Sequence, residues 1–335
     1  MAQPSYQGRF IWRELLCNDT GAAADFYTRV LSWRAQPFSP GSPYLLFTSR
    51  DGKHLAGAMV LSEAARTMGA AAHWRSYIGA ADVDATVAQA AQLGARVLQP
   101  AQDISAVGRV AVLADPEGAT FGLYHPLNES GAGDSGDSGF MWNELAARNR
   151  ETALAFYQQL FAWELRKPME VGGGMVYQTF GLGAKDVGGA YAIPPDRPMS
   201  PAWCPYANCA SADDVAARVV AAGGQVANGP VDVPGGGRIL QFFDSQRAMF
   251  AVHSMAQGAM KPAAKPKPKP KPAKAKPAKA RPKPAKAKAK PAKAKPARKA
   301  GKKAGKKAGK KRAKPVARKA RRKPARKHRK PARKK

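Results

Sequence analysis

The spacing of apolar residues changes from strand-like to helix-like within the first fifty residues. The run FIWRELLC at Phe10–Cys17 is short and largely apolar, which predicts a strand. After a polar turn, Ala22–Leu31 places its apolar side chains on one side of a helix. Glycine-rich turns then separate two further apolar runs, near 44–48 and 55–61. The pattern therefore predicts a strand, a helix and two more strands in succession.

A similar order of elements follows directly. A strand that begins at Ser76 leads to the alanine-rich stretch Val83–Leu93, which predicts a second helix. Gly94 ends that helix, because glycine adopts the positive φ of a helix C-terminus without steric cost. Gly108–Ala114 and Thr120–His125 are apolar runs on either side of the turn sequence DPEG, which predicts paired strands. The pattern thus completes a second βαβββ-like unit.

An internal repeat indicates that this whole arrangement is duplicated. Six residues recur 130 positions later: Trp12, Glu14, Leu15, Phe26, Tyr27 and Trp33 as Trp142, Glu144, Leu145, Phe156, Tyr157 and Trp163. Seven recur 129 positions later: Trp74, Tyr77, Gly94, Gly108, Arg109, Asp115 and Phe121 as Trp203, Tyr206, Gly223, Gly237, Arg238, Asp244 and Phe250. Two constant offsets with one deletion between them indicate a duplicated module.

The second copy predicts the corresponding elements. They are the strands Phe140–Ala147, Arg238–Phe243 and Met249–Ser254 and the helices Thr152–Leu160 and Asp213–Ala222. The fold class is therefore α+β, with paired βαβββ units in each copy. We assign 8–127 and 140–256 to the two modules. The small, polar segment 128–139 is expected to be a flexible linker, and 257–335 a tail.

The tail differs from the rest of the chain in charge. Residues 261–335 contain 37 of the 56 lysines and arginines and neither Asp nor Glu. The remainder has 19 basic residues against all 23 acidic ones, so it is mildly acidic. The tail has no aromatic residue and is rich in proline as far as Pro296, and its like charges repel one another. It is therefore predicted to be disordered and extended.

The cysteines and the lengths of the apolar runs indicate in which cellular compartment the protein is expected. Cys17, Cys204 and Cys209 are odd in number and lack the spacing of a metal site, which is typical of a reducing environment. The sequence contains no run of eighteen apolar residues, which a membrane span would need. The N-terminal residues do not have the pattern of a secretory signal. We therefore expect a cytoplasmic protein.

The repeated motifs resemble the vicinal oxygen chelate superfamily, which includes glyoxalase I, bleomycin-resistance proteins and extradiol dioxygenases. The resemblance covers Gly8–Met255 and rests on W-x-E-L in the first strand, D-F-Y and A-F-Y in the first helix, L-S-W and L-F-A-W after it, and the D-P-E-G turn. At Asp244–Arg247 the second copy reads D-S-Q-R, so the resemblance does not predict the geometry of that turn. The resemblance, which is to tandem glyoxalase-like proteins, implies that each copy forms a curved mixed sheet, an open cup around a ligand or metal.

Catalysis in that superfamily usually needs a divalent metal held by His and Glu, which polarises two adjacent substrate oxygens. The resemblance places the ligands in the first strand, at the start of the fifth and near the end of the last. The corresponding residues are Trp12, Arg75 or Ser76, and Gly122 in the first copy and Trp142, Cys204 or Pro205, and Ala251 in the second. A lone thiol does not make a site. We therefore expect neither a metal nor another cofactor.

Other residues could contact a small molecule in the cups. Strand alternation places Glu14 beside Trp12, and Glu144 beside Trp142, on the face that should line each cup. The ligand-binding candidates also include the equivalent residues of the last strands, and together are Trp12, Glu14, Tyr124, Trp142, Glu144 and His253. A carboxylate in an aromatic-walled cup would have a raised pKa and could act as a base, so Glu14 and Glu144 are the catalytic candidates. The simpler interpretation is that both pair with buried donors and stabilise the sheet.

Two further pairs of polar residues are interpreted structurally. Arg109 and Arg238 follow equivalent glycines, where a role in holding the start of a strand is favoured over anion binding. His54 and His73 lie in or beside predicted loops and are expected to be solvated.

The charge density of the tail predicts binding to DNA or another polyanion. Lysine and arginine that neutralise phosphates release counterions, so the affinity should depend strongly on salt. Without aromatic side chains or a folded reading element, base stacking and base-edge recognition are excluded. The composition resembles linker-histone tails, which implies a nucleoid-associated location. A solubilising tail, or one that binds membranes or polyphosphate, is the alternative.

Three functions remain open on this evidence. The first is a metal-free glyoxalase-like protein that binds an unidentified small molecule and is tethered to DNA by its tail. The second is an enzyme, a glyoxalase-like lyase or isomerase or a dioxygenase relative, with a displaced site at Glu14, Glu144, Tyr124 and His253. The third is a drug-sequestering protein of the bleomycin-resistance type. The missing metal ligands favour the first and the third.

Overall fold

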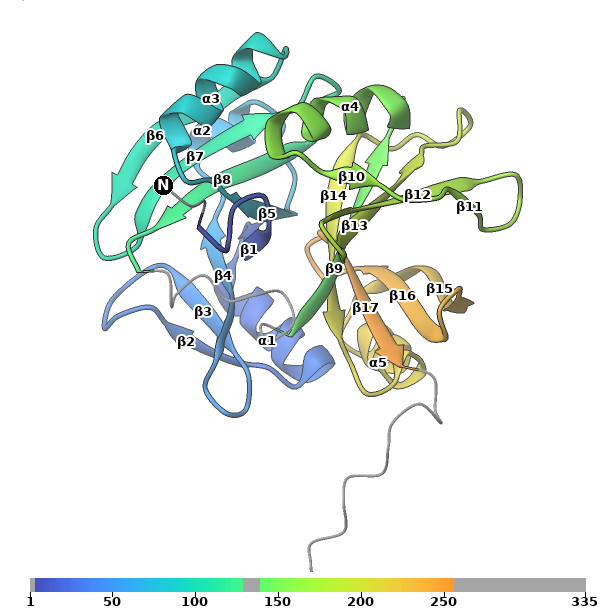
Figure 1. The fold of residues 1–335 in the computed structure, drawn as a ribbon. Helices are drawn as coiled ribbons and strands as arrows, with labels where there is room; N and C mark the ends of the chain where they lie inside the picture. The colour runs from blue at the N-terminus through green and yellow to red at the C-terminus, as the bar shows by residue number, and fades with distance from the viewer. Residues whose placement is uncertain (1–3, 129–138, 256–335) are drawn as a thin grey trace, which may run out of the picture. The chain divides into compact units, whose positions relative to one another are not determined.

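A computed structural model describes residues 4–128 and 139–255 (Figure 1). The chain divides into a unit Met1–Pro268 and a unit Lys269–Lys335, and every described residue belongs to the first. Most of the predicted linker and the whole predicted tail, 257–335, lie outside the described residues. Within the described ranges, no helix is long and apolar enough to cross a membrane.

Residues 10–126 form one eight-stranded mixed sheet, sheet A. Its strands are β1 (Phe10–Cys17), β2 (Arg34–Pro37), β3 (Leu45–Thr48), β4 (His54–Val60), β5 (His73–Gly79), β6 (Arg96–Ile104), β7 (Gly108–Ala114) and β8 (Thr120–Pro126). The helices of this copy are α1 (Thr20–Leu31), α2 (Glu63–Thr67) and α3 (Val83–Gln92). The spatial order is β2-β3-β4-β1-β5-β8-β7-β6, so the first strands of the two βαβββ units, β1 and β5, pair at the centre.

Residues 140–255 repeat this arrangement in sheet B. Its strands are β9 (Phe140–Ala147), β10 (Glu164–Leu165), β11 (Met169–Glu170), β12 (Val176–Leu182), β13 (Lys185–Ala192), β14 (Ala202–Asn208), β15 (Gln225–Val233), β16 (Gly237–Phe243) and β17 (Met249–Met255). The helices are α4 (Arg150–Phe161) and α5 (Ala212–Ala221). The order is β10-β12-β13-β9-β14-β17-β16-β15, with β11 paired to β12. The α+β fold with tandem modules is therefore confirmed.

The hydrophobic pattern located the central elements better than the edges. β1, β7 and β9 have the predicted bounds. The edge strands β2 and β6 were not predicted, because most of their side chains are exposed and show no apolar alternation. The expectation that His73 is solvated was wrong: it begins β5, its Nδ1 lies 2.9 Å from the carbonyl of Ala71, and its Nε2 is buried.

Each hydrophobic core is shared by the two copies. One core joins α3 and the β5–β8 half of sheet A to α4 and the first half of sheet B, with the rings of Phe121 and Phe156 6.1 Å apart. The other joins α1 and the first half of sheet A to α5 and the second half of sheet B, with Phe26 and Phe242 also 6.1 Å apart. Figure 1 shows the resulting helix pairs, α3 with α4 and α1 with α5. The opposite face of each sheet carries no such core, and we call it the cup face.

The tyrosine of the D-F-Y motif bridges the two copies. Tyr27 in α1 donates a hydrogen bond to Asp244 Oδ2, 3.0 Å away in the turn between β16 and β17. Its hydroxyl accepts one from Trp74 Nε1 at 2.7 Å. All three side chains are buried, so a family motif that looks local in the sequence holds the copies together.

The same bridge forms with the copies exchanged. Tyr157 in α4 donates to Asp115 Oδ2 at 3.0 Å and accepts from Trp203 Nε1 at 2.9 Å. Glu117, in the turn of the first copy, also accepts hydrogen bonds from the backbone N–H groups of Arg148 and Asn149, just before α4, at 2.6 and 2.8 Å. Each copy thus contributes a tyrosine to the turn aspartate of the other copy, so the two bridges are equivalent.

The D-S-Q-R turn has the geometry of the D-P-E-G turn. Asp244 Oδ1 accepts from the backbone N–H groups of Gln246 and Ala248 at 2.8 and 2.9 Å, as Asp115 Oδ1 does at the equivalent positions. Arg247 adopts φ +74° where Gly118 adopts +102°. The sequence difference is therefore absorbed by an arginine in the left-handed region.

The two structurally interpreted arginines hold strand starts in place. Arg109 forms paired hydrogen bonds with Asp84 at the start of α3 and a third with Asp103. Arg238 contacts Asp213 at 2.8 and 3.1 Å and Asp232 at 2.9 Å. The structural role favoured for both arginines is confirmed.

Changing Ala106 to glycine should stabilise the protein. Ala106 is exposed and has φ +61°, whereas its equivalent in the second copy, Gly235, has φ +98°. A Cβ atom costs about 1–2 kcal/mol in the left-handed region, partly offset by the entropy of glycine in the unfolded chain. We expect Ala106→Gly to raise the free energy of unfolding by about 0.5–1 kcal/mol in urea titrations.

The control is the mirror substitution, Gly235→Ala. No atom lies within 4 Å of a Cβ at Gly235, so only the backbone term acts there, and the expected change is of similar size and opposite sign. Changes of the same sign in both variants would contradict the explanation.

Candidate functional site

The first cup face holds a carboxylate bound by two tyrosines. Glu14 in β1 is 7% exposed and lies beside Trp12 on this face. Its Oε1 accepts from the Tyr44 hydroxyl at 3.0 Å and its Oε2 from the Tyr77 hydroxyl at 2.8 Å. Trp12 Nε1 donates to the Tyr44 hydroxyl at 3.1 Å. The four side chains form one connected network.

An arginine completes this network with a positive charge. Arg75 in β5 pairs with Glu14 across the two central strands, and its Nη1 lies 3.6 Å from Glu14 Oε2. The same nitrogen lies 3.5 Å from the Tyr77 hydroxyl. The side chains of Arg75 and Glu14 are only 14% and 9% exposed. The first cup therefore contains a carboxylate that is already ion-paired within the protein.

The second cup face repeats the carboxylate and the tyrosines. Glu144 in β9 is 8% exposed, and its Oε1 accepts from the Tyr206 hydroxyl at 2.9 Å and from Gln241 Nε2 at 2.7 Å. Tyr177 also hydrogen bonds to Glu144. Trp142 Nε1 donates to the Tyr177 hydroxyl at 2.8 Å. The Trp–Tyr–Glu–Tyr network is thus present in both copies.

Glycines on the neighbouring strands make room for the tyrosine rings. A Cβ atom on Gly57 of β4, which pairs with Glu14, would collide with the side chain of Tyr44. A Cβ atom on Gly189 of β13, which pairs with Glu144, would collide with Tyr177 in the same way. Each tyrosine therefore lies flat over a glycine and points its hydroxyl at the network.

The two cups differ in the residue opposite the carboxylate. Cys204 of β14 pairs with Glu144 as Arg75 pairs with Glu14. Glu144 consequently has neutral hydrogen-bond donors around it and no cation in the arginine's place. Burial raises its pKa, opposed by the hydrogen bonds from Tyr206, Tyr177 and Gln241. The second cup thus holds a buried acid that has only neutral hydrogen-bond partners among the described residues.

A small apolar cluster lies beside this acid. Cys204, Tyr206 and Ala251 form its buried part. Partly buried side chains pack against it: Met141, Trp142, Ile239 and Met249. Apolar and aromatic walls with a few polar groups are typical of small-molecule sites, and methionine adapts to ligands of different shape.

The two candidates on the last strands lie apart from the carboxylates. The Tyr124 hydroxyl donates to the carbonyl of Val107 at 3.2 Å. The His253 ring lies against Gly237, its Nδ1 is buried without a hydrogen-bond partner, and burial lowers its pKa. Within the described residues neither hydrogen bonds to Glu14 or Glu144. The displaced site of four residues stays a prediction, because only Glu14 and Glu144 lie in the tyrosine networks described above.

Several residues of the networks were missed in the sequence. Tyr77 and Tyr206 belong to the repeat at offset 129, and that signal could have marked them as cup-facing. Tyr44 and Tyr177 are 133 positions apart, because the intervening loops differ in length. Only the pairing of the strands brings these two tyrosines within hydrogen-bonding distance of the carboxylates.

The donor set does not fit the metal of the superfamily. The described residues contain no group of three or more His, Cys, Asp or Glu side chains that could hold a metal ion. Gly122, at one ligand position, lies under the Tyr77 ring, where any side chain would collide. The networks are instead built for hydrogen bonding between protein side chains.

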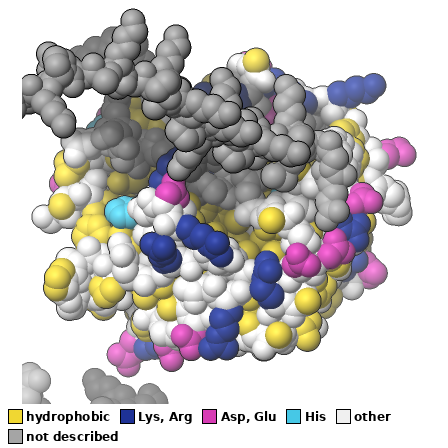
Figure 2. Space-filling model, turned by 90° about the horizontal axis from the view of Figure 1, so that it is seen from below, with side chains coloured by type: hydrophobic (Ala, Val, Ile, Leu, Met, Phe, Trp, Pro, Cys, Tyr) yellow, Lys and Arg dark blue, Asp and Glu magenta, His cyan; other side chains and the backbone are white. Residues whose placement is uncertain are grey.

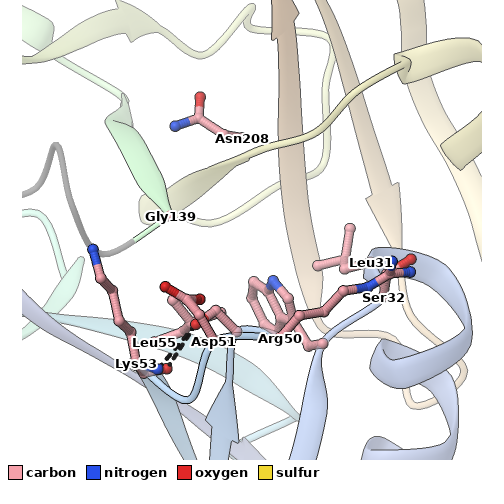
Figure 3. Close-up of a pocket in the computed structure, with 10 residues that line it drawn as sticks. Leu31, Ser32, Arg50, Asp51, Lys53, Leu55, Gly139 and Asn208 are labelled. Atoms are coloured by element: carbon pink, nitrogen blue, oxygen red, sulfur yellow. Dashed lines mark hydrogen bonds between the residues drawn. The ribbon is translucent and has the colours of Figure 1, made fainter. Parts of the chain in front are cut away.

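Two adjoining cavities, of about 490 and 430 Å³, lie away from the cup faces. Figure 3 shows the first, with Arg50, Asp51 and Lys53 from the turn between β3 and β4 on one side and Asn208 on the other; Arg50 extends toward Ser32. The three charged side chains are exposed. Among the described residues, the buried polar atoms that have no hydrogen-bond partner all lie outside the linings of these two cavities.

The visible surface carries both signs of charge. Seen from below, Lys and Arg side chains are interspersed with Asp and Glu over the described residues (Figure 2). The part of this face that is not covered by grey atoms therefore mixes both signs, in keeping with the mildly acidic composition of the chain outside 261–335.

Comparison with known proteins identifies the class that this fold defines. The family model described as "Glyoxalase-like domain" matches residues 13–124. The Mycobacterium tuberculosis protein named "Putative glyoxylase CFP32" is 33% identical over 249 residues, which cover 73% of this chain and 94% of that protein. The chain therefore belongs to the glyoxalase-like proteins of the vicinal oxygen chelate superfamily. In particular, it is a tandem-module protein similar to the mycobacterial one.

Other relatives extend the comparison. The anthracycline biosynthesis protein DauV of a Streptomyces species is 30% identical over 254 residues, covering 72% of this chain and 91% of that protein. DnrV of Streptomyces peucetius, of the same description, is 29% identical over 260 residues, covering 74% and 93%.

Solved structures with little sequence identity share the fold. The Mn(II)-bound glyoxalase of Novosphingobium aromaticivorans has a TM-score of 0.51 at 15% identity, covering 74% of this chain and 82% of that chain. The 2,3-dioxygenase LapB of Pseudomonas sp. KL28 has a TM-score of 0.51 at 13% identity, covering 75% and 94%. Both likenesses concern the fold.

Proposed function

We propose that the protein binds a small molecule and that its second cup is the binding site. The observation that carries this proposal is Glu144, a buried carboxyl group that is surrounded by neutral donors and lacks the arginine of the first cup. The neighbouring cluster around Trp142 supplies apolar area for a ligand. In the first cup, by contrast, Arg75 forms an ion pair with Glu14.

The class of ligand follows from the walls of the site. Trp142 and Tyr177 are partly exposed on the cup face and present flat aromatic rings. Stacking on such rings favours a planar aromatic molecule. The names of the two Streptomyces relatives, which refer to anthracycline biosynthesis, support a planar polycyclic ligand for this chain as well.

Daunorubicin, an anthracycline, is the first probe. We expect the full-length protein, freed of nucleic acid, to bind it and to quench its fluorescence on titration. Trp142→Ala should weaken binding at least about tenfold, because it removes a ring of the site. The matched variant Trp12→Ala, in the first cup, should leave the affinity nearly unchanged.

Equal losses of affinity in the two tryptophan variants would contradict the assignment of the binding site to the second cup. Failure of the wild-type protein to bind daunorubicin or any other planar aromatic probe would overturn the proposed ligand class. Circular dichroism of both variants separates a loss of binding from a loss of fold.

We further propose that residues 261–335 tether the protein to DNA or another polyanion, which implies a nucleoid-associated, cytoplasmic location. The support is the sequence itself: 37 basic residues and no acidic ones in this segment. The rest of the chain is mildly acidic and would not bind DNA through its net charge.

The tether predicts a steep dependence of affinity on salt. We expect the logarithm of the affinity of the full chain for duplex DNA to fall linearly with the logarithm of KCl concentration, with a slope near −0.9 per phosphate neutralised. Changing the seven basic residues of 321–330 to glutamine should make that slope shallower. Binding that is indifferent to KCl would exclude counterion release and with it the tether.

A further inference from the structure

The two copies make a natural comparison of one site with and without an internal cation. Sheet pairing places Arg75 opposite Glu14 in the first cup and Cys204 opposite Glu144 in the second. Both carboxylates are nearly buried, and both receive hydrogen bonds from cup-face tyrosines. The main chemical difference is therefore one of charge: a guanidinium lies beside the carboxylate in the first cup, and the neutral amide of Gln241 lies beside it in the second.

The guanidinium of Arg75 occupies a defined place in the first cup. Its Nη1 approaches Glu14 Oε2 at 3.6 Å and the Tyr77 hydroxyl at 3.5 Å, and its Nε is buried without a hydrogen-bond partner. In the second cup Cys204 carries no such charge, and the neutral amide of Gln241 donates to Glu144 Oε1 and to the Tyr206 hydroxyl, at 2.7 Å each. Among the described residues, no Lys or Arg side chain therefore takes the part of Arg75 beside Glu144. The carboxyl of Glu144 and the ring of Tyr206 remain there, with the partly buried Trp142 beside them.

These groups have the chemistry that recognises an aromatic cation. A positive charge is attracted to the faces of tryptophan and tyrosine rings, and most strongly where water is excluded. A carboxylate among neutral donors adds a direct charge partner, and a buried charge that gains a partner loses much of its desolvation penalty. The apolar side chains Met141 and Met249 can adjust around a flat ring system.

We propose that the second cup binds planar aromatic cations, and that Arg75 supplies the corresponding positive charge in the first cup, as a built-in substitute for such a ligand. This inference rests on the proposed function and makes it specific. It assigns one ligand to each chain, in the second cup. It also implies that the residues at positions 75 and 204 determine which cup can bind a cationic ligand.

The test compares a charged and a neutral probe of similar shape. Proflavine is a planar tricyclic cation at neutral pH, and acridone is a neutral planar tricycle. In calorimetric titrations of the full-length protein, free of nucleic acid, we expect one proflavine per chain and an affinity for acridone at least about tenfold lower. Equal affinities for the two probes would overturn the requirement for a cation.

Two substitutions at position 204 test the role of the arginine. Cys204→Arg should abolish proflavine binding, because the new guanidinium would pair with Glu144 in the ligand's place. Ala210→Arg, the control, adds the same guanidinium at an exposed position outside the cup and should bind as the wild type does. If Cys204→Arg does not fold, Glu144→Gln supplies the test: it should weaken proflavine at least about tenfold and leave acridone nearly unchanged.

The reciprocal variant in the first cup is the sharpest test. Arg75→Cys removes the internal cation, and we expect the stoichiometry of proflavine to rise from one to two per chain. A stoichiometry that stays at one would show that Arg75 does not stand in for a ligand. If acridone binds and responds to Trp142→Ala, but Glu144→Gln leaves proflavine binding unchanged, the cation inference fails while the proposed function stands. If neither probe binds the wild type, the proposed ligand class itself fails.

Discussion

Changing Asp115 to alanine should lower the free energy of unfolding by about 3–5 kcal/mol, since each buried donor left without a partner costs about 1–3 kcal/mol. Asp115 is 2% exposed and accepts three hydrogen bonds, from the backbone N–H groups of Glu117 and Ala119 and from the Tyr157 hydroxyl of the other copy. Urea denaturation of the full-length protein measures the change.

A double-mutant cycle separates the bridge between copies from the turn. Tyr157→Phe removes the hydroxyl that links the copies, while Asp115→Asn removes the charge and keeps an acceptor for the turn. The coupling energy between these two substitutions should be about 1–3 kcal/mol, the range for residues that share one buried network. The same cycle at Tyr27 and Asp244 should give a similar value, because the geometry there is equivalent. Coupling near zero at both bridges would contradict their role in holding the copies together.

Changing Arg13 to methionine, by contrast, should stabilise the protein by about 1–3 kcal/mol. Arg13 is 1% exposed, its Nη1 donates to the carbonyl of Phe10 at 3.1 Å, and its Nε and Nη2 have no partner. Its guanidinium lies 4.9 Å from the centre of the Phe140 ring, which offsets only part of the desolvation cost. Methionine fills similar space without a charge.

The pH dependence of this effect has a defined sign. Burial lowers the pKa of Arg13 to about 9, well below its ordinary value. Above pH 9 the unfolded chain therefore binds more protons than the folded one, so stability rises with pH there. The cost of burying the charge is present in full below pH 9, where Arg13→Met should show its largest gain.

Arg75→Met is the matched control for Arg13→Met. Arg75 is also nearly buried, but it is paired with Glu14, so its loss leaves a carboxylate without its cation and should destabilise the protein. Thermal and urea denaturation of the two variants should shift in opposite directions. A loss of stability in Arg13→Met comparable to that in Arg75→Met would mean that Arg13 has a partner among groups such as bound water.

The sequence predicted the central elements and the duplication because both depend on local or repeated signals. The bounds of β1 and β9 follow from short apolar runs, and the repeat is visible as constant offsets. The pairing of Glu14 with Tyr44 could not be predicted, because that tyrosine lies 30 residues away and outside the register of the repeat. The exposed edge strand β6 carries no apolar alternation and was missed for that reason.

By itself, the sequence determined the α+β class, the two modules, the positions of Glu14 and Glu144 on strands that line the cups, and the concentration of positive charge in 261–335. Only the tertiary structure decided which residues surround each carboxylate and that the cores are shared between copies. The physical reason is that hydrogen bonds, ion pairs and ring contacts depend on distances in space. Arg75 and Cys204 correspond in the repeat, but the sequence does not show which side chains lie beside them. Strand pairing places both opposite a buried glutamate, and that placement distinguishes the two cups.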